Sequence, residues 1–185
     1  MVAIFTNVAN RFFGINPKEA ERFFKFAVVG AIGFVVDFGV LNLLLQPFAN
    51  ALSTGGWLNT AVSSISNNPP SLAEEFAGTI SFICAILSNF LFNRFYTYPD
   101  SREKGLVSQF IQFSLVSVAG IVIRIPILLL TTTFFQNMIS RIASLEPFAF
   151  RLGANLALVL AVIIVMFWNF FVNRYWTYND VSSEP

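Results

Sequence analysis

Four long apolar runs dominate this chain and limit it to a membrane-spanning helical fold. A helix rises 1.5 Å per residue, so about 20 apolar residues cross the roughly 30 Å hydrocarbon core of a bilayer. The runs at 23–47, 75–96, 106–135 and 148–176 all reach that length. Only 11% of the residues are charged, against about 25% in a soluble domain. The sequence therefore predicts an all-α integral membrane protein with four transmembrane helices.

The segments around these runs predict the remaining organisation. Residues 1–16 place their apolar side chains on one helical side, which suits a short helix on the membrane surface or a segment that orders only on assembly. Asn16, Pro17 and Glu19 supply an N-cap, a proline at the first helical position and an acidic residue in the first turn, so a helix should start at Pro17. The membrane domain is then 17–178, followed by a short acidic tail at 179–185.

The distribution of positive charge predicts the orientation. Two of the cations, Arg141 and Arg151, fall on one side of the predicted membrane. Eight fall on the other side: Arg11, Lys18, Arg22, Lys25, Arg94, Arg102, Lys104 and Arg174. Because Lys and Arg are enriched in cytoplasmic segments, both termini and the loop at 97–105 are expected in the cytoplasm.

One ten-residue stretch occurs twice, at the ends of the second and fourth runs. The first copy spans 89–98 and the second spans 169–178, with Asn, Phe, Asn, Arg, Thr and Tyr at the same places. Asparagine is costly in hydrocarbon unless its amide finds a partner. A long cationic side chain can reach a lipid phosphate, and aromatic rings belong at the membrane surface. We interpret the shared polar residues as a lipid-phosphate or headgroup site: Asn89, Asn93, Arg94, Asn169, Asn173 and Arg174.

The first and third runs also match, at an offset of 87 positions, while the second and fourth match at 80. Two-helix units return the chain to its starting side, so the sequence predicts two parallel repeats related by a pseudo-two-fold axis along the membrane normal. The offset of 87 also makes Asp37 equivalent to Arg124. A charge near the bilayer centre costs at least about 2.5 kcal/mol, so pairing would lower the cost for both. Either a structural ion pair or a polar step for a headgroup fits this pattern.

Small residues at a spacing of four mark the second and fourth runs. Ala77, Ser81 and Ala85 form such a row in the second run, and Gly153 and Ala157 begin the equivalent row in the fourth. Small residues let membrane helices approach closely. We therefore expect these rows to be packing surfaces.

Several classes of chemistry are not expected from this composition. The chain has no His, which removes His-based metal ligation and His acid–base catalysis, and its single Cys84 lies in an apolar run. No nucleophile–base pair or metal cluster can be assembled from the membrane-embedded residues. We expect no cofactor, no metal site, no enzymatic activity and no nucleic-acid partner.

These motifs, in this order, resemble the GtrA-like family of four-helix membrane proteins of polysaccharide synthesis. The resemblance covers roughly residues 22–178. It is carried by Phe23-Phe24-Lys25-Phe26-x-x-Val29-Gly30, by Val36-Asp37-Phe38, and by both Asn-Arg-x-x-Thr-Tyr endings. The family is also similar to the membrane domain of some dolichyl-phosphate mannose synthases. The N-terminal 20 residues and the long 48–74 connection exceed what the family leads us to expect.

The resemblance implies translocation of a polyprenyl-phosphate-linked monosaccharide across the plasma membrane. A second reading is a non-catalytic anchor for a polyprenyl-phosphate glycosyltransferase. A third is a small ion or drug exporter coupled to Asp37, which ranks last because Arg124 at the equivalent position would hold that carboxylate charged. Expected partners are the sugar lipid and membrane lipids, with a glycosyltransferase partner and a homo-oligomer left open.

Overall fold

The computed structural model describes residues 16–63, 66, 68–101 and 103–181. Within these residues every regular element is helical and no strand occurs. The helix predicted within residues 1–16 and the end of the tail predicted at 179–185 lie outside the described residues. The chain divides into two compact units, Met1–Pro99 with Ser183–Pro185, and Asp100–Ser182. Each unit is described by itself.

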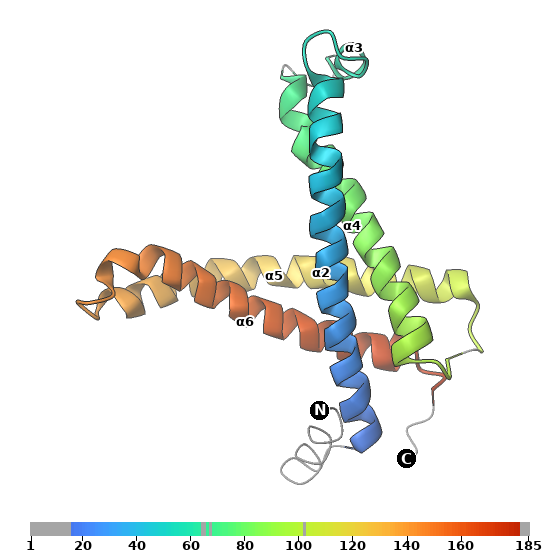
Figure 1. Ribbon diagram of the computed structural model, residues 1–185. Coiled ribbons are helices and arrows are strands. Elements are labelled where there is room, and N and C mark those ends of the chain that lie inside the picture. The colour runs from blue at the N-terminus through green and yellow to red at the C-terminus, as the bar shows by residue number, and fades with distance from the viewer. Residues whose placement is uncertain (1–15, 64–65, 67, 102, 182–185) are drawn as a thin grey trace. The chain divides into compact units, whose positions relative to one another are not determined.

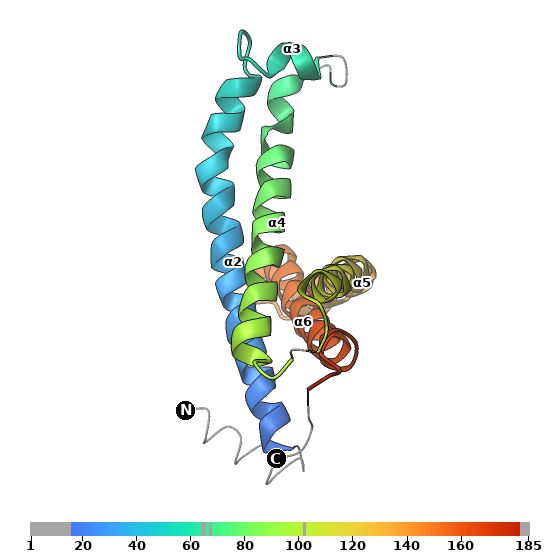
Figure 2. The same cartoon turned by 90° about the vertical axis from the view of Figure 1, so that its right-hand side faces the viewer.

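The first unit is a hairpin of two long helices. Helix α2 (Pro17–Leu52) runs beside α4 (Ala73–Phe92), which continues into a single π-helical turn, η2 (Asn93–Thr97) (Figures 1 and 2). Helix α2 begins at Pro17 as predicted, since the Asn16 Oδ1 atom accepts from the Lys18 amide at 2.9 Å.

The second unit repeats this plan. Helix α5 (Leu106–Ser140) runs beside α6 (Ala149–Val172), and α6 continues into a second π-helical turn, η4 (Asn173–Thr177). A short 3₁₀ turn, η3 (Glu146–Phe148), precedes α6.

Four helical stretches are long and apolar enough to span a membrane: Pro17–Leu52, Pro69–Thr97, Leu106–Ser140 and Glu146–Thr177. Each predicted span lies inside one of them. Their apolar side chains are largely exposed, including Phe34 at 69%, Leu43 at 75% and Leu129 at 74%. Such surfaces are stable in hydrocarbon rather than in water. The chain is therefore a multi-pass membrane protein, as predicted.

The long connection in the first unit is folded into a cap over the end of the hairpin. A short helix α3 (Asn59–Val62) and a 3₁₀ turn η1 (Pro69–Leu72) follow α2 (Figure 2). The Asn59 Nδ2 atom donates to the Leu52 carbonyl at 2.7 Å, satisfying a free carbonyl at the helix end. Buried Leu52, Val62 and Ala73 form a small apolar cluster beneath this cap.

Small residues mediate the contact between the two helices of each hairpin. Ala77, Ser81 and Ala85 are buried on α4, and Gly153, Ala157 and Ala161 are buried on α6. The rows predicted as packing surfaces are therefore buried. Gly153 lies against the backbone of α5, where an added Cβ atom would lie 2.6 Å from the Gln136 backbone nitrogen.

Replacing Gly153 by Ala should destabilise the second hairpin, because the Cβ atom would collide with backbone that has no rotamer to change. We expect a loss of about 1–3 kcal/mol, the usual cost of overpacking, seen as a lower melting temperature of the purified protein in detergent. Gly78→Ala is the matched control, since a Cβ atom there meets nothing within 4 Å and alanine favours the helix. Equal melting temperatures for the two variants would contradict the close contact.

Candidate functional site

The two copies of the repeated stretch adopt the same local structure, a π-helical turn that ends a membrane helix. The Tyr98 amide donates to the Asn93 carbonyl at 2.8 Å, and the Tyr178 amide donates to the Asn173 carbonyl at 2.8 Å. These i→i+5 bonds widen the last turn of each helix. Such turns are rare and are often found at functional sites.

This wide turn separates the polar residues of the motif from its aromatic residues. In the first copy Asn93, Arg94, Thr97 and Tyr98 are buried, and the second copy buries the equivalent Asn, Arg, Thr and Tyr. The intervening aromatic rings are exposed in both copies: Phe95, Tyr96, Tyr175 and Trp176. The aromatic residues are thus free to contact lipid, as an interfacial belt requires, while the amides and guanidinium groups face the protein.

In the second copy, the polar side chains form a continuous chain of hydrogen bonds along the helix. The Asn169 Nδ2 atom donates to the Val165 carbonyl at 2.9 Å, and Asn173 Nδ2 donates to the Asn169 carbonyl at 2.8 Å. The Thr177 hydroxyl then donates to Asn173 Oδ1 at 2.8 Å. Both Asn amide nitrogens, Asn173 Oδ1 and the Thr177 hydroxyl therefore have partners within their own helix.

Arg174 is also held within the protein. Its side chain donates to the Tyr178 carbonyl at 3.3 Å and to the Val181 carbonyl at 3.4 Å, and the residue is only 3% exposed. The sequence predicts that this cation reaches a lipid phosphate, whereas the structure gives it backbone carbonyls just beyond the turn. Lipid-phosphate binding by Arg174 stays a prediction.

A group of polar residues from the start of the second unit holds the same turn, and no sequence motif predicts it. We use "clasp" for Ser101, Lys104 and Gln109 together with Asp180. The Lys104 Nζ atom donates to the Trp176 carbonyl at 2.5 Å, and the Ser101 hydroxyl donates to Asp180 Oδ1 at 2.6 Å. Buried Gln109 donates to the Ser101 hydroxyl. The charges of the short 99–105 loop were the only available signal.

The first copy has different neighbours, which come from the start of α2. Arg22 is 4% exposed, pairs with Glu19 at 2.8 Å and lies over the Tyr98 ring, 5.7 Å from its centroid. Lys25 pairs with Glu21 at 2.7 Å and lies 5.2 Å from the centroid of the Tyr96 ring. The sequence predicts both cations on the cytoplasmic side of the membrane and gives no indication that Arg22 is buried.

Asn89 and Asn169, one turn before the π-helical turns, each pack on a glycine of the neighbouring helix. A Cβ atom at Gly33 would collide with the Asn89 amide, and one at Gly120 would lie 2.9 Å from Asn169 Nδ2. Glycine at these two positions therefore makes room for an asparagine inside each helix pair. The sequence alignment of the first and third runs contains both glycines but does not reveal this contact.

Asp37 has a partner in its own hairpin. The Ser81 hydroxyl donates to Asp37 Oδ1 at 2.6 Å and Ser81 is 1% exposed. The equivalent position to Ser81 in the second hairpin is the buried Ala161, so Arg124 on α5 has no such hydroxyl there. Asp37 and Arg124 belong to different units, and their pairing stays a prediction.

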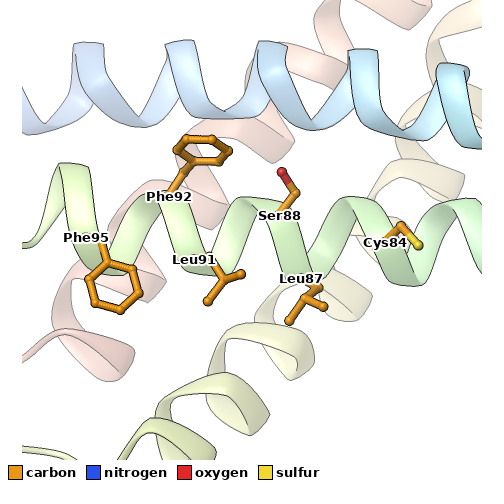
Figure 3. Close-up of a pocket in the computed structure, with 6 residues that line it drawn as sticks. All are labelled: Cys84, Leu87, Ser88, Leu91, Phe92 and Phe95. Atoms are coloured by element: carbon orange, nitrogen blue, oxygen red, sulfur yellow. The ribbon is translucent and has the colours of Figure 1, made fainter.

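An apolar hollow lies along the second half of α4 and reaches the first π-helical turn. Figure 3 shows its six lining residues: Cys84, Leu87, Ser88, Leu91, Phe92 and Phe95. Leu87, Leu91 and Phe95 follow one side of the helix, and Ser88 and Phe92 point toward α2. A lining of this chemistry suits a hydrocarbon chain better than a polar ligand. Among the described residues, no cluster of three or more metal-ligating side chains occurs.

Ser81→Ala should weaken the first hairpin, because it removes the hydrogen bond that holds Asp37 against α4. Interhelical hydrogen bonds in membranes average about 0.6 kcal/mol and reach about 1.7, so we expect a loss of about 1 kcal/mol in unfolding measurements. Ser114→Ala is the control, since the Ser114 hydroxyl bonds only to the Phe110 carbonyl of its own helix. A Ser81 variant as stable as the control would show that the bond contributes nothing.

The chain matches a known family of membrane domains. The family described as GtrA/DPMS, transmembrane domain, matches residues 25–178, which include most of α2, the whole of the other three membrane helices and the second motif to its last residue. No curated protein and no solved structure matches the chain.

Proposed function

Because the chain belongs to the GtrA/DPMS transmembrane domain family, we propose that it translocates a polyprenyl-phosphate-linked monosaccharide across the membrane. The family match supports a role in polysaccharide or glycosylation processes that use lipid-linked sugars. Flipping is the step we add to that role. The product would serve cell-surface polysaccharide synthesis or glycosylation, and the membrane would be the plasma membrane.

The observation that carries the proposal is the pair of π-helical turns. Each of these membrane helices ends with two asparagines one helical turn apart. The second asparagine opens the π-helical turn, which also contains an arginine, a threonine and exposed aromatic rings. A phosphosugar headgroup offers a phosphate for cations and hydroxyls for amides, so these side-chain types suit it. We retain Asn89, Asn93, Arg94, Asn169, Asn173 and Arg174 as the candidate headgroup residues, with Arg174 also holding its own turn.

The apolar hollow on α4 supports the same ligand class. A polyprenyl phosphate carries a long hydrocarbon chain directly behind its phosphate. The hollow reaches Phe95, which belongs to the first π-helical turn. A prenyl chain lying along α4 would therefore leave the phosphate beside that turn.

For orientation, we propose cytoplasmic termini and two parallel hairpins related by a pseudo-two-fold axis. The support is the excess of Lys and Arg at one end of the helices. Both turns would then face the cytoplasm, where nucleotide-sugar donors are used. In a Cys84→Ser background, a cysteine replacing the exposed Asp100 should react only with reagents that enter the cell, and one replacing the 80% exposed Trp57 should react from outside.

The direct test of the function is a flipping assay. Purified protein in phosphatidylcholine liposomes should accelerate the transfer of a polyprenyl-phosphate hexose between leaflets, read out by oxidation of accessible sugar with membrane-impermeant periodate. Arg94→Gln should slow transfer at least tenfold, whereas Arg141→Gln, an exposed cation at the opposite helix ends, should not.

The alternative is that the protein is a membrane anchor. In that case it should bind the lipid without transferring it and should retain a polyprenyl-phosphate glycosyltransferase on the liposomes. Lys104 is unsuitable as the cationic control, because its Nζ atom donates to carbonyls of η4.

The pairing of Asp37 with Arg124 is part of the proposal and has its own test. Removing one partner of a buried ion pair typically costs about 3–5 kcal/mol, so Asp37→Ala and Arg124→Ala should each lower the folded yield. The double variant should recover part of it, and exchange of the two charges should also fold. A double variant no better than the worse single variant would show that the two charges do not meet.

Transport by the folded double variant separates the two roles of this pair. Undiminished flipping would make it a structural contact, and loss of flipping would make it a step on the headgroup path.

A further inference from the structure

We infer that the two copies of the turn have divided their roles: the first, at the end of α4, binds the sugar of the headgroup, and the second, at the end of α6, is structural. This inference rests on the proposed function and deepens it, because it narrows the six candidate headgroup residues to Asn89, Asn93 and Arg94 of the first copy. The sequence treats the two copies as equal, because their polar residues are identical. The difference lies in how those residues are satisfied.

The row formed by Asn89, Asn93 and Thr97 on the first copy is left open: Asn89 Oδ1, Asn93 Oδ1 and Thr97 Oγ1 are buried and have no hydrogen-bond partner in the described structure. They fall at a spacing of four along one helix, and Asn93 and Thr97 are each 1% exposed. The equivalent Asn173 and Thr177 are equally buried but bond to each other at 2.8 Å. The same residue types in the same kind of turn therefore form a closed chain in one hairpin and an open row in the other.

The identity of these atoms indicates the ligand group. A carboxamide oxygen only accepts hydrogen bonds, and a hydroxyl can accept or donate. A phosphate oxygen cannot satisfy an acceptor, whereas a sugar hydroxyl can donate to it. A buried group left unsatisfied costs about 1–3 kcal/mol, so a hydroxyl-bearing headgroup gains by bonding to this row. Gln109 Oε1 on α5 also lacks a partner, but it lies outside both turns.

The two turns also differ in the charge of the residues beside them on the neighbouring helix. The first turn has Arg22 and Lys25 beside Tyr98 and Tyr96. Their equivalents at the offset of 87 are Gln109 and Gln112, which carry no charge. Both glutamines bond to clasp residues, Gln109 to Ser101 and Gln112 to Lys104.

Lys25 is paired with Glu21 but keeps 24% of its side chain exposed, so a phosphate that approached it would share or replace this exposed ion pair. The first unit thus offers hydroxyl acceptors, a partly exposed cation and the apolar hollow of α4. In the second unit, the corresponding polar residues bond to the protein itself. This places sugar, phosphate and prenyl chain at the first turn.

Thr97→Val and Thr177→Val test this division, since each removes one hydroxyl with little change in shape. Thr177→Val breaks the bond to Asn173 and should lower the melting temperature without weakening lipid binding by the folded protein. Thr97→Val breaks no bond within the protein, so the melting temperature should not fall. It should weaken binding of the sugar lipid about two- to tenfold, the effect of one hydrogen bond.

Binding is measured by titrating the full chain in phosphatidylcholine nanodiscs with three lipids. These are a polyprenyl-phosphate hexose, sugar-free polyprenyl phosphate, and phosphatidylglycerol, whose headgroup also carries hydroxyls. The Thr97 variant should lose affinity only for the hexose lipid. Equal loss of affinity in both Thr variants, or no loss in the Thr97 variant, would overturn the division of roles while leaving the proposed function standing.

Loss confined to phosphatidylglycerol would assign the first turn to an ordinary membrane lipid and overturn the sugar assignment. A wild-type chain that binds neither polyprenyl lipid would contradict the proposed function, and this inference would fall with it.

Discussion

Every backbone polar group that enters hydrocarbon must find a partner inside the protein, and the architecture of this chain follows from how its helix ends meet that requirement. A helix leaves four carbonyls without intrahelical partners at its end. Here α4 and α6 each end in a π-helical turn whose last amide reaches back five residues. That turn keeps aromatic rings toward the lipid and polar side chains toward the helix pair. Loss of the turn would expose two amides, a hydroxyl and a guanidinium group to hydrocarbon at once.

Close helix approach depends on the same requirement. Gly33 and Gly120 leave room for the amides of Asn89 and Asn169, and the small residues on α4 and α6 bring each pair together. Within each hairpin the contact surface is narrow and rich in small residues, while large side chains cover the outside. Packing and polar satisfaction, rather than burial of a large apolar core, therefore hold each hairpin together.

The sequence was sufficient to predict the four helices, the start of α2 and the residue types of the candidate site. Apolar run length, the Asn16-Pro17 cap and the duplicated stretch are local signals, and each has a direct physical meaning. The π-helical geometry had no such signal, because nothing in the residues at 93–97 distinguishes a wide turn from an α-helical end. The burial of Arg174 followed from that geometry, since a cation after an apolar run reads first as one that reaches the lipid surface.

The sequence also could not predict that the two copies of the motif form different hydrogen bonds. Identical residues adopt different hydrogen bonds because their neighbours differ: α2 supplies Arg22 and Lys25 to one turn, and the 101–104 segment supplies the clasp to the other. The hydrogen bond from Ser81 to Asp37 likewise depends on how α2 and α4 are rotated about their own axes. The spacing of the repeats in the sequence does not determine that rotation. Side-chain partners across helices, rather than the helices themselves, are what one sequence leaves undetermined.

The clasp has a consequence for the order of events during synthesis. Helix α2 packs against α3, η1, α4 and η2, which all precede residue 99, so the first hairpin can pack while the ribosome is still making the second. Ser101 and Lys104 are translated early and can bond to Gln109 and Gln112 of the following helix, but their bonds to Asp180 and Thr177 form only when those residues emerge. Until then the clasp stays open, and its closure marks the moment at which the fourth helix has been inserted.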